Sequence, residues 1–200
     1  MEDPLSLDDL RAQMQKCVRC DLRASCTQVV PGDGPANAKI LILGEAPGAD
    51  EDIAGRPFVG RAGRLLRDTL EKNGLQDKHY FVMHTCQCKP PENRTPTPEE
   101  IEACWPWVSA TLKLVRPKIV VTLGKPALFT VAQKFGFAKK LGQLPIMKLA
   151  GKPVYLEDRH FYVFPTLHPT YALRQNEARQ DFQDHLKYLA KALPTWLLRP

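Results

Sequence analysis

Four short apolar runs, separated by segments of helical periodicity, constrain the fold of this chain more than any other feature of its sequence. The runs cover residues 39–43, 80–83, 118–124 and 162–165. They are nearly continuous rather than alternating, which is typical of strands buried on both faces of a parallel sheet. Alternation of strands with helices predicts right-handed crossovers and helices on both faces. The sequence therefore predicts a three-layer α/β/α fold around a central four-stranded, mostly parallel sheet.

The segments between and after these runs carry the helix signals. Residues 97–100, Thr-Pro-Glu-Glu, place proline and two acids in the first turn of a helix, and Gly74 ends an earlier one. A short antiparallel hairpin is expected over residues 154–163. Helices are expected over residues 64–73, from residue 98 onward, over 126–135 and over 180–193.

Length and composition favour one domain. The chain has 200 residues, of which 44% are hydrophobic, so it can bury one substantial core. We therefore expect a single domain over residues 1–200. No apolar run approaches the roughly 18 residues that cross a bilayer, and the acidic start over residues 1–4 is unlike a signal peptide. We expect a cytoplasmic protein with no membrane partner, associated with the nucleoid if its partner is DNA.

The charge distribution favours a phosphate-bearing partner. The formal net charge of +6 suits a polyanion but is also compatible with an ordinary protein. Arg56, Arg61, Arg64 and Arg67 crowd one segment, whereas a merely solvated surface usually mixes the two signs. This segment is therefore the candidate for phosphate contact.

Chemically useful side chains stand where the predicted strands end. Glu45, His84, Gly124 and His168 close or follow the four apolar runs. The carboxyl ends of parallel strands meet at one edge of a sheet, where α/β proteins bind their ligands. The loop over residues 44–63 adds further acids, an aromatic side chain and glycines. We expect the functional groups to gather at this edge.

Six cysteines in a chain expected to be cytoplasmic argue against a disulfide framework. A C-x-x-C pair near the N-terminus and two single cysteines farther along can supply four metal ligands, with Cys26 and Cys86 left over. The candidate ligands are Cys17, Cys20, Cys88 and Cys104. Four thiolates hold either zinc or an iron–sulfur cluster, and their spacing does not choose between them. Ordinary burial of Cys86 and Cys104 is the alternative.

Three separated motifs follow one another along the chain. They are G-E-A-P-G at 44–48 with G-R-P-F-V-G-R-A-G at 55–63, K-P-P-E-N-R-T-P-T-P-E-E at 89–100, and H-P-T-Y-A-L-R at 168–174. Together with the cysteine pattern they resemble the family 4 uracil-DNA glycosylases, in order, from Cys17 to about Arg174. Agreement across the separated motifs is far more specific than any single one.

This resemblance implies an activity and a cofactor. The activity is hydrolysis of the bond between uracil, a deaminated base, and deoxyribose in DNA, which leaves an abasic site for base excision repair. The target lies inside the duplex, so its nucleotide must rotate out into a pocket at a cost of a few kcal/mol. The cofactor is a structural [4Fe–4S] cluster on the four candidate cysteines. DNA is the implied partner, and a monomer is the simpler expectation because one flipped base needs one pocket.

The resemblance also implies roles for individual residues. His168 matches the histidine that donates to the negative charge developing on the departing base, as in an oxyanion hole. Phe58 offers an aromatic face to the flipped base, worth about 1–3 kcal/mol. The implied catalytic residues are Glu45, Glu51, Asn93 and His168. The implied base-binding residues are Gly44, Phe58 and His84, and the implied DNA-binding residues are Arg61, Gly63, Arg64, Thr170, Tyr171 and Arg174.

Several of these roles have structural alternatives, and one residue departs from the family. Phe58 is otherwise a core residue after Pro57, Glu51 a surface acid of the loop, and Asn93 a residue that caps a turn. His84 stands where the family has asparagine. A carboxamide donates to uracil O4 and accepts from N3–H together, whereas each imidazole nitrogen does one of these per tautomer.

The departure at His84 leaves several hypotheses open. The first hypothesis is a uracil glycosylase in which His84 donates to O4. The second is a glycosylase that prefers deaminated purines. The third is a protein that binds uracil-bearing or abasic DNA with little turnover. A buried histidine bonded to a loop carbonyl is the structural alternative for His84. A plain iron–sulfur or zinc redox protein is the alternative for the whole chain.

Overall fold

The computed structural model describes residues 6–138 and 145–198. A five-stranded sheet runs through it in the order β2-β1-β3-β5-β4. The strands are β1 (Ile40–Gly44), β2 (Tyr80–His84), β3 (Ile119–Leu123), β4 (Val154–Leu156) and β5 (Phe161–Thr166). The helices are α1 (Leu7–Gln15), α2 (Leu22–Ser25), α3 (Ala49–Ala54), α4 (Arg61–Lys72), α5 (Pro98–Val115), α6 (Gly124–Lys134), α8 (Ile146–Leu149), α9 (Pro169–Ala172) and α10 (Asn176–Leu197), with 3-10 turns η1 (Asp77–His79) and η2 (Pro91–Asn93).

The sheet is parallel except at one edge. β2, β1, β3 and β5 are parallel, and β4 pairs antiparallel with β5. Gly44 lies opposite His84, and Leu123 lies opposite Thr166, so the four parallel strands end at one edge. The predicted α/β/α fold and the predicted hairpin are both confirmed. The hairpin contributes the fifth strand, one more than the four expected.

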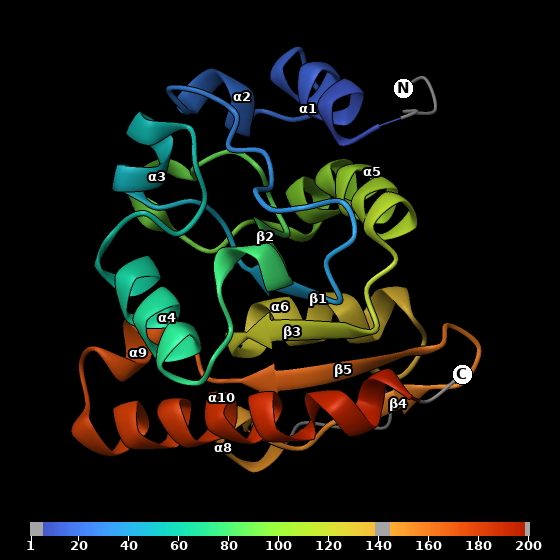
Figure 1. Ribbon diagram of the computed structural model, residues 1–200. Helices are drawn as coiled ribbons and strands as arrows, with labels where there is room; N and C mark the ends of the chain where they lie inside the picture. The colour runs from blue at the N-terminus through green and yellow to red at the C-terminus, as the bar shows by residue number, and fades with distance from the viewer. Residues whose placement is uncertain (1–5, 139–144, 199–200) are drawn as a thin grey trace.

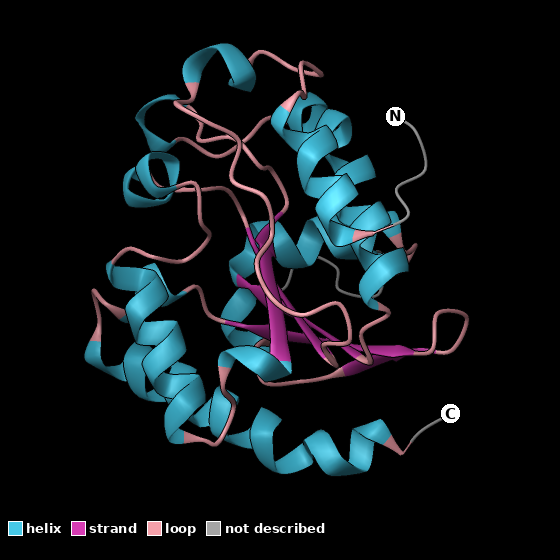
Figure 2. Cartoon of the chain, turned by 45° about the horizontal axis from the view of Figure 1, so that its top comes forward, coloured by secondary structure: helices cyan, strands magenta, loops and turns pink. Residues whose placement is uncertain are grey.

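Helices cover both faces of the sheet (Figure 1). Because side chains alternate along a strand, Leu41 and Leu43 of β1 face one core, and Ile40 and Ile42 face the other. The first core includes side chains of α1, α5 and α6, and the second includes side chains of α4, α9 and α10. Figure 2 shows the strands enclosed between these helices. The site at the sheet edge is therefore built on a rigid, doubly covered support.

The sequence predicts the start of α5 correctly and misses the start of α4. α5 begins at Pro98 as predicted, where Thr97 Oγ1 accepts from Glu100 N at 3.3 Å and the Glu100 carboxylate accepts from Thr97 N at 2.8 Å. α4 begins at Arg61, three residues before the predicted start. Its first turn, Arg-Ala-Gly-Arg, has no large apolar side chain, so it carries no apolar periodicity. Among the residues that the structure describes, no helix has the length and apolar character needed to span a membrane.

Candidate active site at the carboxyl edge of the sheet

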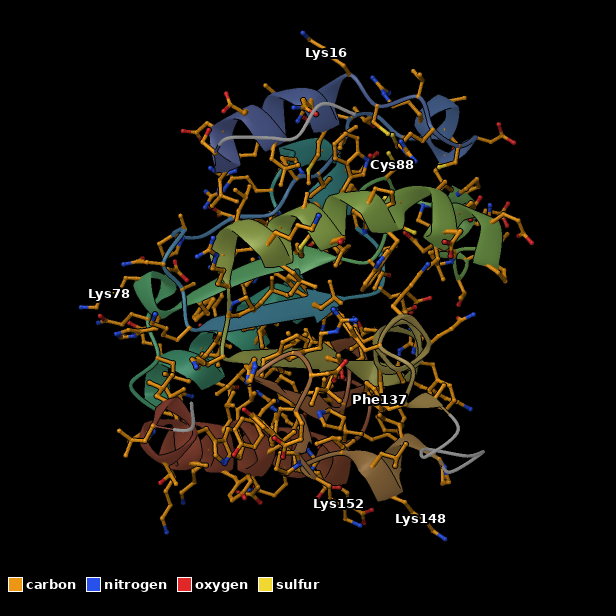
Figure 3. The ribbon with its side chains drawn as sticks, turned by 90° about the vertical axis from the view of Figure 1, so that its right-hand side faces the viewer. Lys16, Lys78, Cys88, Phe137, Lys148 and Lys152 are labelled. Atoms are coloured by element: carbon orange, nitrogen blue, oxygen red, sulfur yellow. The ribbon has the colours of Figure 1, made fainter. Side chains whose placement is uncertain are left out.

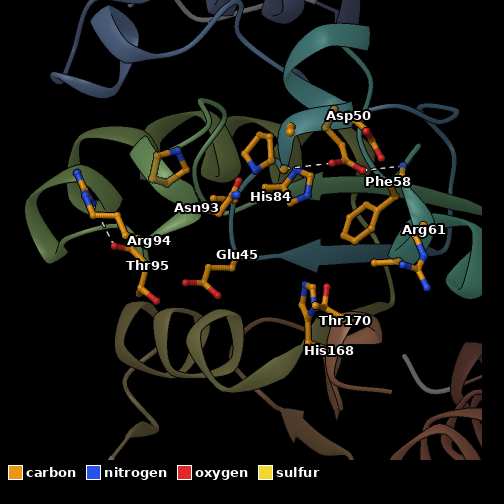
Figure 4. Close-up of a pocket in the computed structure, with 18 of the residues that line it drawn as sticks. Glu45, Asp50, Phe58, Arg61, His84, Asn93, Arg94, Thr95, His168 and Thr170 are labelled. Carbon is orange, nitrogen blue, oxygen red and sulfur yellow. Dashed lines mark hydrogen bonds between the residues drawn. The ribbon is translucent and has the colours of Figure 1, made fainter. Parts of the chain in front are cut away.

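A pocket of about 480 Å³ lies at the edge where the parallel strands end (Figure 4). Glu45, His84 and His168 line it from the ends of β1, β2 and β5. Gly124, at the end of β3, adjoins them, since a Cβ there would lie 3.1 Å from His168 Cβ. The prediction that these four positions meet at one edge is confirmed.

Two aromatic rings stack at the base of the pocket. The Phe58 and His84 rings have centroids 4.6 Å apart and an interplanar angle of 18°. Phe58 is only 4% exposed and has φ of 55°, an uncommon conformation for a bulky residue. A Cβ on Gly44 would lie 2.7 Å from Phe58 Cζ and 2.9 Å from His84 Cδ2. Glycine at position 44 therefore lets the rings close over the end of β1.

Glu51 holds the loop that carries Phe58. Its carboxylate accepts hydrogen bonds from the backbone N–H groups of Gly48 at 3.1 Å, Val59 at 3.0 Å and Gly60 at 2.9 Å. Both carboxylate oxygens are thus engaged, and the residue is 9% exposed. This geometry fixes the backbone around Phe58, and Glu51 also lines the pocket. Its burial departs from the alternative of a surface acid, and its catalytic role stays a prediction.

Gly63 lies inside the fold. A Cβ at this position would lie 1.9 Å from the carbonyl oxygen of Phe58, so only glycine lets α4 pack against that backbone. The residue is buried, so glycine at this position has a packing reason. Its expected contact with DNA stays a prediction. Gly63, like Glu51, serves to place Phe58.

The arginines of this segment divide into two groups. Arg56 pairs with Asp33 at 2.9 Å and Arg67 with Asp77 at 2.5 Å, so these cations are engaged within the fold. Arg61 lines the pocket from the first residue of α4. The exposed Arg64 donates to the carbonyl of Val59 at 3.3 Å. Arg61 and Arg64 therefore remain the candidates for phosphate contact.

His168 is held in one tautomer. Its Nδ1 accepts from the backbone N–H of Thr170 at 3.2 Å, which caps the short helix α9. Burial lowers the pKa of His168 from 6.5 to about 4, so the ring is neutral at physiological pH. A neutral imidazole that accepts at Nδ1 carries its hydrogen on Nε2. His168 therefore offers an N–H donor to the pocket (Figure 4).

His84 is more deeply buried, at 3% exposure. Burial, followed by the nearby His168, lowers the pKa of His84 from 6.5 to about 3, so this ring is neutral as well. Its Nδ1 is buried with no hydrogen-bond partner among the described residues. The structural alternative, a bond from the ring to a loop carbonyl, is thus not seen at Nδ1. Nε2, at the far end of the ring, is the nitrogen left for a ligand.

The proline-rich loop forms another wall. Asn93 lines the pocket with φ of 55°, and the preceding Glu92 has φ of 54°. Arg94 clamps this loop by donating through both terminal nitrogens to Glu100, at 2.8 and 2.6 Å. The Arg94 guanidinium holds the pKa of the Glu100 carboxyl below its usual value. Sequence reasoning missed Arg94, although the capping box at 97–100 marked Glu100 as an anchor.

The last motif forms the outer rim. Thr170 and Arg174 line the pocket beside His168. Tyr171 is 39% exposed and donates from its hydroxyl to Gln175 Oε1 at 2.9 Å. The three positions lie on or directly after α9, the helix that His168 caps. Of the three residues expected to bind DNA, Thr170 and Arg174 therefore border the pocket, and Tyr171 lies beside them on α9 without lining it.

The four candidate ligand cysteines line a second, smaller cavity. Cys17, Cys20, Cys88 and Cys104 surround it, and Figure 3 shows Cys88 between the N-terminal segment and α5. Cys26 and Cys86 do not belong to its lining. Trp107 Nε1 donates to Cys17 Sγ at 3.3 Å, and Gln87 N donates to Cys104 Sγ at 3.2 Å. Over residues 6–138 and 145–198, no three Cys, His, Asp or Glu side chains are arranged to hold a single metal ion.

The fold and the pocket together define an α/β protein with a cavity beyond the carboxyl ends of its strands, the place where proteins of this class bind ligands. By sequence, the chain belongs to the uracil DNA glycosylase superfamily, whose profile it matches over residues 31–193. It is similar to the type-4 uracil-DNA glycosylase of Thermotoga maritima, with 40% identity over 172 residues that cover 84% of each chain. It is also similar to the type-4 enzyme of Archaeoglobus fulgidus, with 35% identity over 188 residues that cover 93% of this chain and 92% of the relative.

Proposed function

We propose that this protein removes uracil from DNA by hydrolysing the bond between the base and deoxyribose, leaving an abasic site for repair. The observation that carries the proposal is the tautomer of His168, whose Nδ1 accepts from Thr170 N and whose Nε2–H therefore donates to the pocket. A uracil leaving group gathers negative charge as the C1′–N1 bond breaks. A donor placed where that charge develops lowers the barrier.

Phe58 and His84 form the surface that receives the base. Their stacked rings already exclude a ligand from the space between them, because the centroids are 4.6 Å apart. In the proposed complex a flipped uracil therefore lies against the small part of the Phe58 ring that lines the pocket and meets the edge of His84. Stacking of this kind offsets part of the cost of extracting the base from the duplex.

The water that completes the hydrolysis needs a polar group near the sugar. Glu45 follows β1 directly, is half-buried and lines the pocket, and Asn93 faces the same space from η2. In the proposed reaction water adds to C1′ as the bonding electrons leave with N1 of uracil, and the proton lost by the water neutralises the departing anion or passes to solvent. Glu45 orients this water and stabilises the cation-like sugar, with Asn93 as a second polar contact.

The rim of the pocket supplies contacts to the DNA backbone. Arg61, Arg64 and Arg174 are exposed, and Arg61 and Arg174 border the pocket itself. In the proposed complex these cations and the hydroxyl of Thr170 contact phosphates on either side of the flipped nucleotide. Phosphate contacts give affinity without sequence preference, as a damage-directed enzyme requires.

The cysteine cavity fits an iron–sulfur cluster better than a single ion. Its four thiols line a shared space rather than converge on one point, and N–H donors from Trp107 and Gln87 reach two of the sulfurs. Hydrogen bonds of this kind accompany thiolate ligands of clusters. We propose a structural [4Fe–4S] cluster held by Cys17, Cys20, Cys88 and Cys104. When bound, it supplies cross-links between the N-terminal segment, the end of β2 and α5 rather than a chemical step.

A matched pair of substitutions tests this ligand set. We expect Cys88→Ala to lose most of its iron and its brown colour, because one of four ligands is gone. Cys86→Ala, at a buried cysteine whose thiol lies beside that of Cys104 but does not line the cavity, should retain both. The measurement is iron and zinc per chain with the visible absorption spectrum. The reverse pattern, or a colourless wild-type protein with stoichiometric zinc, would contradict the assignment.

The activity itself is tested with a panel of bases. Purified protein is incubated with duplexes that carry a single uracil, hypoxanthine or xanthine, and alkali then cleaves any abasic site. We expect cleavage of the uracil duplex above all others. Retarded mobility without cleavage would show binding without turnover and contradict the proposed activity. Preferential cleavage at a deaminated purine would contradict the proposed substrate.

His84→Asn should raise uracil excision by about five- to tenfold. A carboxamide makes two hydrogen bonds to uracil where neutral imidazole makes one, and one such bond is worth about 1 kcal/mol. The substitution also removes the buried Nδ1 that has no partner. The measurement is single-turnover excision from the uracil duplex, compared with wild type. An unchanged or lower rate would show that His84 does not stand in for a carboxamide.

A further inference from the structure

A five-residue segment joins the two sites of this protein. His84 ends β2 and lines the base pocket, and Cys88 lines the cysteine cavity four residues later. The segment between them is irregular, yet it is buried throughout. Its hydrogen bonds therefore decide whether the two sites are mechanically independent.

Gln87 makes contacts toward both sites at once. Its backbone N–H donates to Cys104 Sγ at 3.2 Å, and its side-chain Nε2 donates to the backbone carbonyl of His84 at 2.6 Å. The residue is only 1% exposed. One buried residue thus contacts a candidate cluster ligand with its backbone and the base-reading residue with its side chain.

The rest of the segment is fastened to the strand that carries Glu45. Thr85 N donates to the Gly44 carbonyl at 2.9 Å, and Cys86 N donates to the Glu45 carbonyl at 3.1 Å. Thr85 Oγ1 also donates to the Glu45 carbonyl, at 2.5 Å. A displacement of the segment would therefore move His84 and the backbone of Glu45 together.

Burial alone does not account for an amide side chain at position 87. Its Oε1 is buried with no hydrogen-bond partner among the described residues, which is unfavourable for a polar atom. An apolar side chain of similar size, such as methionine, fills the same space without that unpaired oxygen. The favourable contact that the amide does make is the one to His84. This contact is the local reason for an amide at position 87.

We infer that Gln87 is a positioning residue that couples the cysteine site to the base pocket, an inference that rests on the proposed function and cluster. With the ligand cysteines fixed, the N–H bond to Cys104 fixes the Gln87 backbone. The Gln87 amide then holds the end of β2 so that the His84 ring stays stacked on Phe58 and presents its free edge to the base. Coupling of this kind is reciprocal, so base binding must also act on the cluster.

The variant Gln87→Met tests this coupling because it removes the bond to His84 and keeps the backbone N–H. Gln133→Met, at an exposed position of α6, is the matched control. We expect Gln87→Met to hold as much iron per chain as wild type and to lose about tenfold in kcat on a uracil duplex, with little change in KM. Gln133→Met should match wild type in both measurements.

A spectroscopic readout separates coupling from a general structural effect. The probe is a duplex with one 2′-fluorinated deoxyuridine, whose glycosidic bond resists the cation-like transition state. We expect its binding to change the visible circular dichroism of the cluster in wild type and not in Gln87→Met. A thymine duplex should cause no change in either protein.

Three results would overturn the inference. They are wild-type kinetics in Gln87→Met, loss of iron in that variant, and a wild-type spectrum that does not respond to the fluorinated duplex. If wild-type protein releases no uracil, the proposed function fails. The spectral response needs binding but no turnover, so it still decides whether the two sites are coupled.

Discussion

Replacing His168 by alanine lowers the rate constant of uracil excision by about 10²–10³-fold, the loss expected when one donor to a developing anion is removed. The donor acts on charge that appears only in the transition state. Binding of the intact substrate therefore changes little, and the loss falls on kcat rather than on KM. Single-turnover excision and a separate measurement of affinity for the uracil duplex distinguish the two.

A second substitution separates this chemistry from folding. His168 also caps α9, since Nδ1 accepts from Thr170 N at 3.2 Å, and alanine removes that contact. In His168→Asn the side-chain oxygen takes the place of Nδ1 as acceptor, while the amide nitrogen stands where Cδ2 stood and does not reach the position of Nε2–H. We expect a similar loss of rate with nearly unchanged stability toward urea. His160→Ala, on the exposed turn between β4 and β5, is the control, and a wild-type rate in His168→Asn would contradict the assigned role.

The sheet and its functional edge could be predicted because their signals are local. The apolar run at 80–83 differs from β2 by a single residue, and the hairpin over 154–163 contains both predicted strands. A buried strand needs apolar residues on both faces, so its sequence is conspicuous. Once the strands are parallel, topology alone brings Glu45, His84 and His168 to the same edge. No knowledge of side-chain contacts is needed for that step.

The roles of residues whose partners are brought together only by folding could not be predicted in this way. Glu51 accepts from backbone groups at positions 48, 59 and 60, and the approach of those three groups is a property of the folded loop. Gly63 matches a family motif, yet the reason for glycine there is a carbonyl five residues earlier. Gln87 carries no sequence signal at all. These residues hold the site in place, and they became visible only through burial and distances.

The lowered pKa values of the two buried histidines, His84 and His168, predict that the protein loses stability in mild acid. The ordinary pKa of histidine is about 6.5. Burial lowers the pKa of His168 to about 4. Burial and the nearby His168 lower the pKa of His84 to about 3. Above pH 6.5 the rings are neutral in both the folded and the unfolded chain, so their contribution to stability is complete. As the pH falls below 6.5, the unfolded chain takes up protons that the folded protein does not. Stability therefore decreases with falling pH until the folded rings begin to protonate, at about pH 4 for His168 and about pH 3 for His84.

The size of this loss follows from one proton per histidine. Each proton changes the free energy of unfolding by about 1.4 kcal/mol per pH unit, so each ring costs roughly 2 kcal/mol between pH 7 and pH 5. We expect His168→Asn to reduce the pH dependence of the unfolding free energy by about that amount, measured by urea titration at pH 7, 6 and 5 with iron content checked at each pH. His185, whose pKa burial also lowers, contributes equally to both proteins and cancels in the comparison. The same pH dependence in wild type and His168→Asn would show that the His168 ring is not held neutral by the fold.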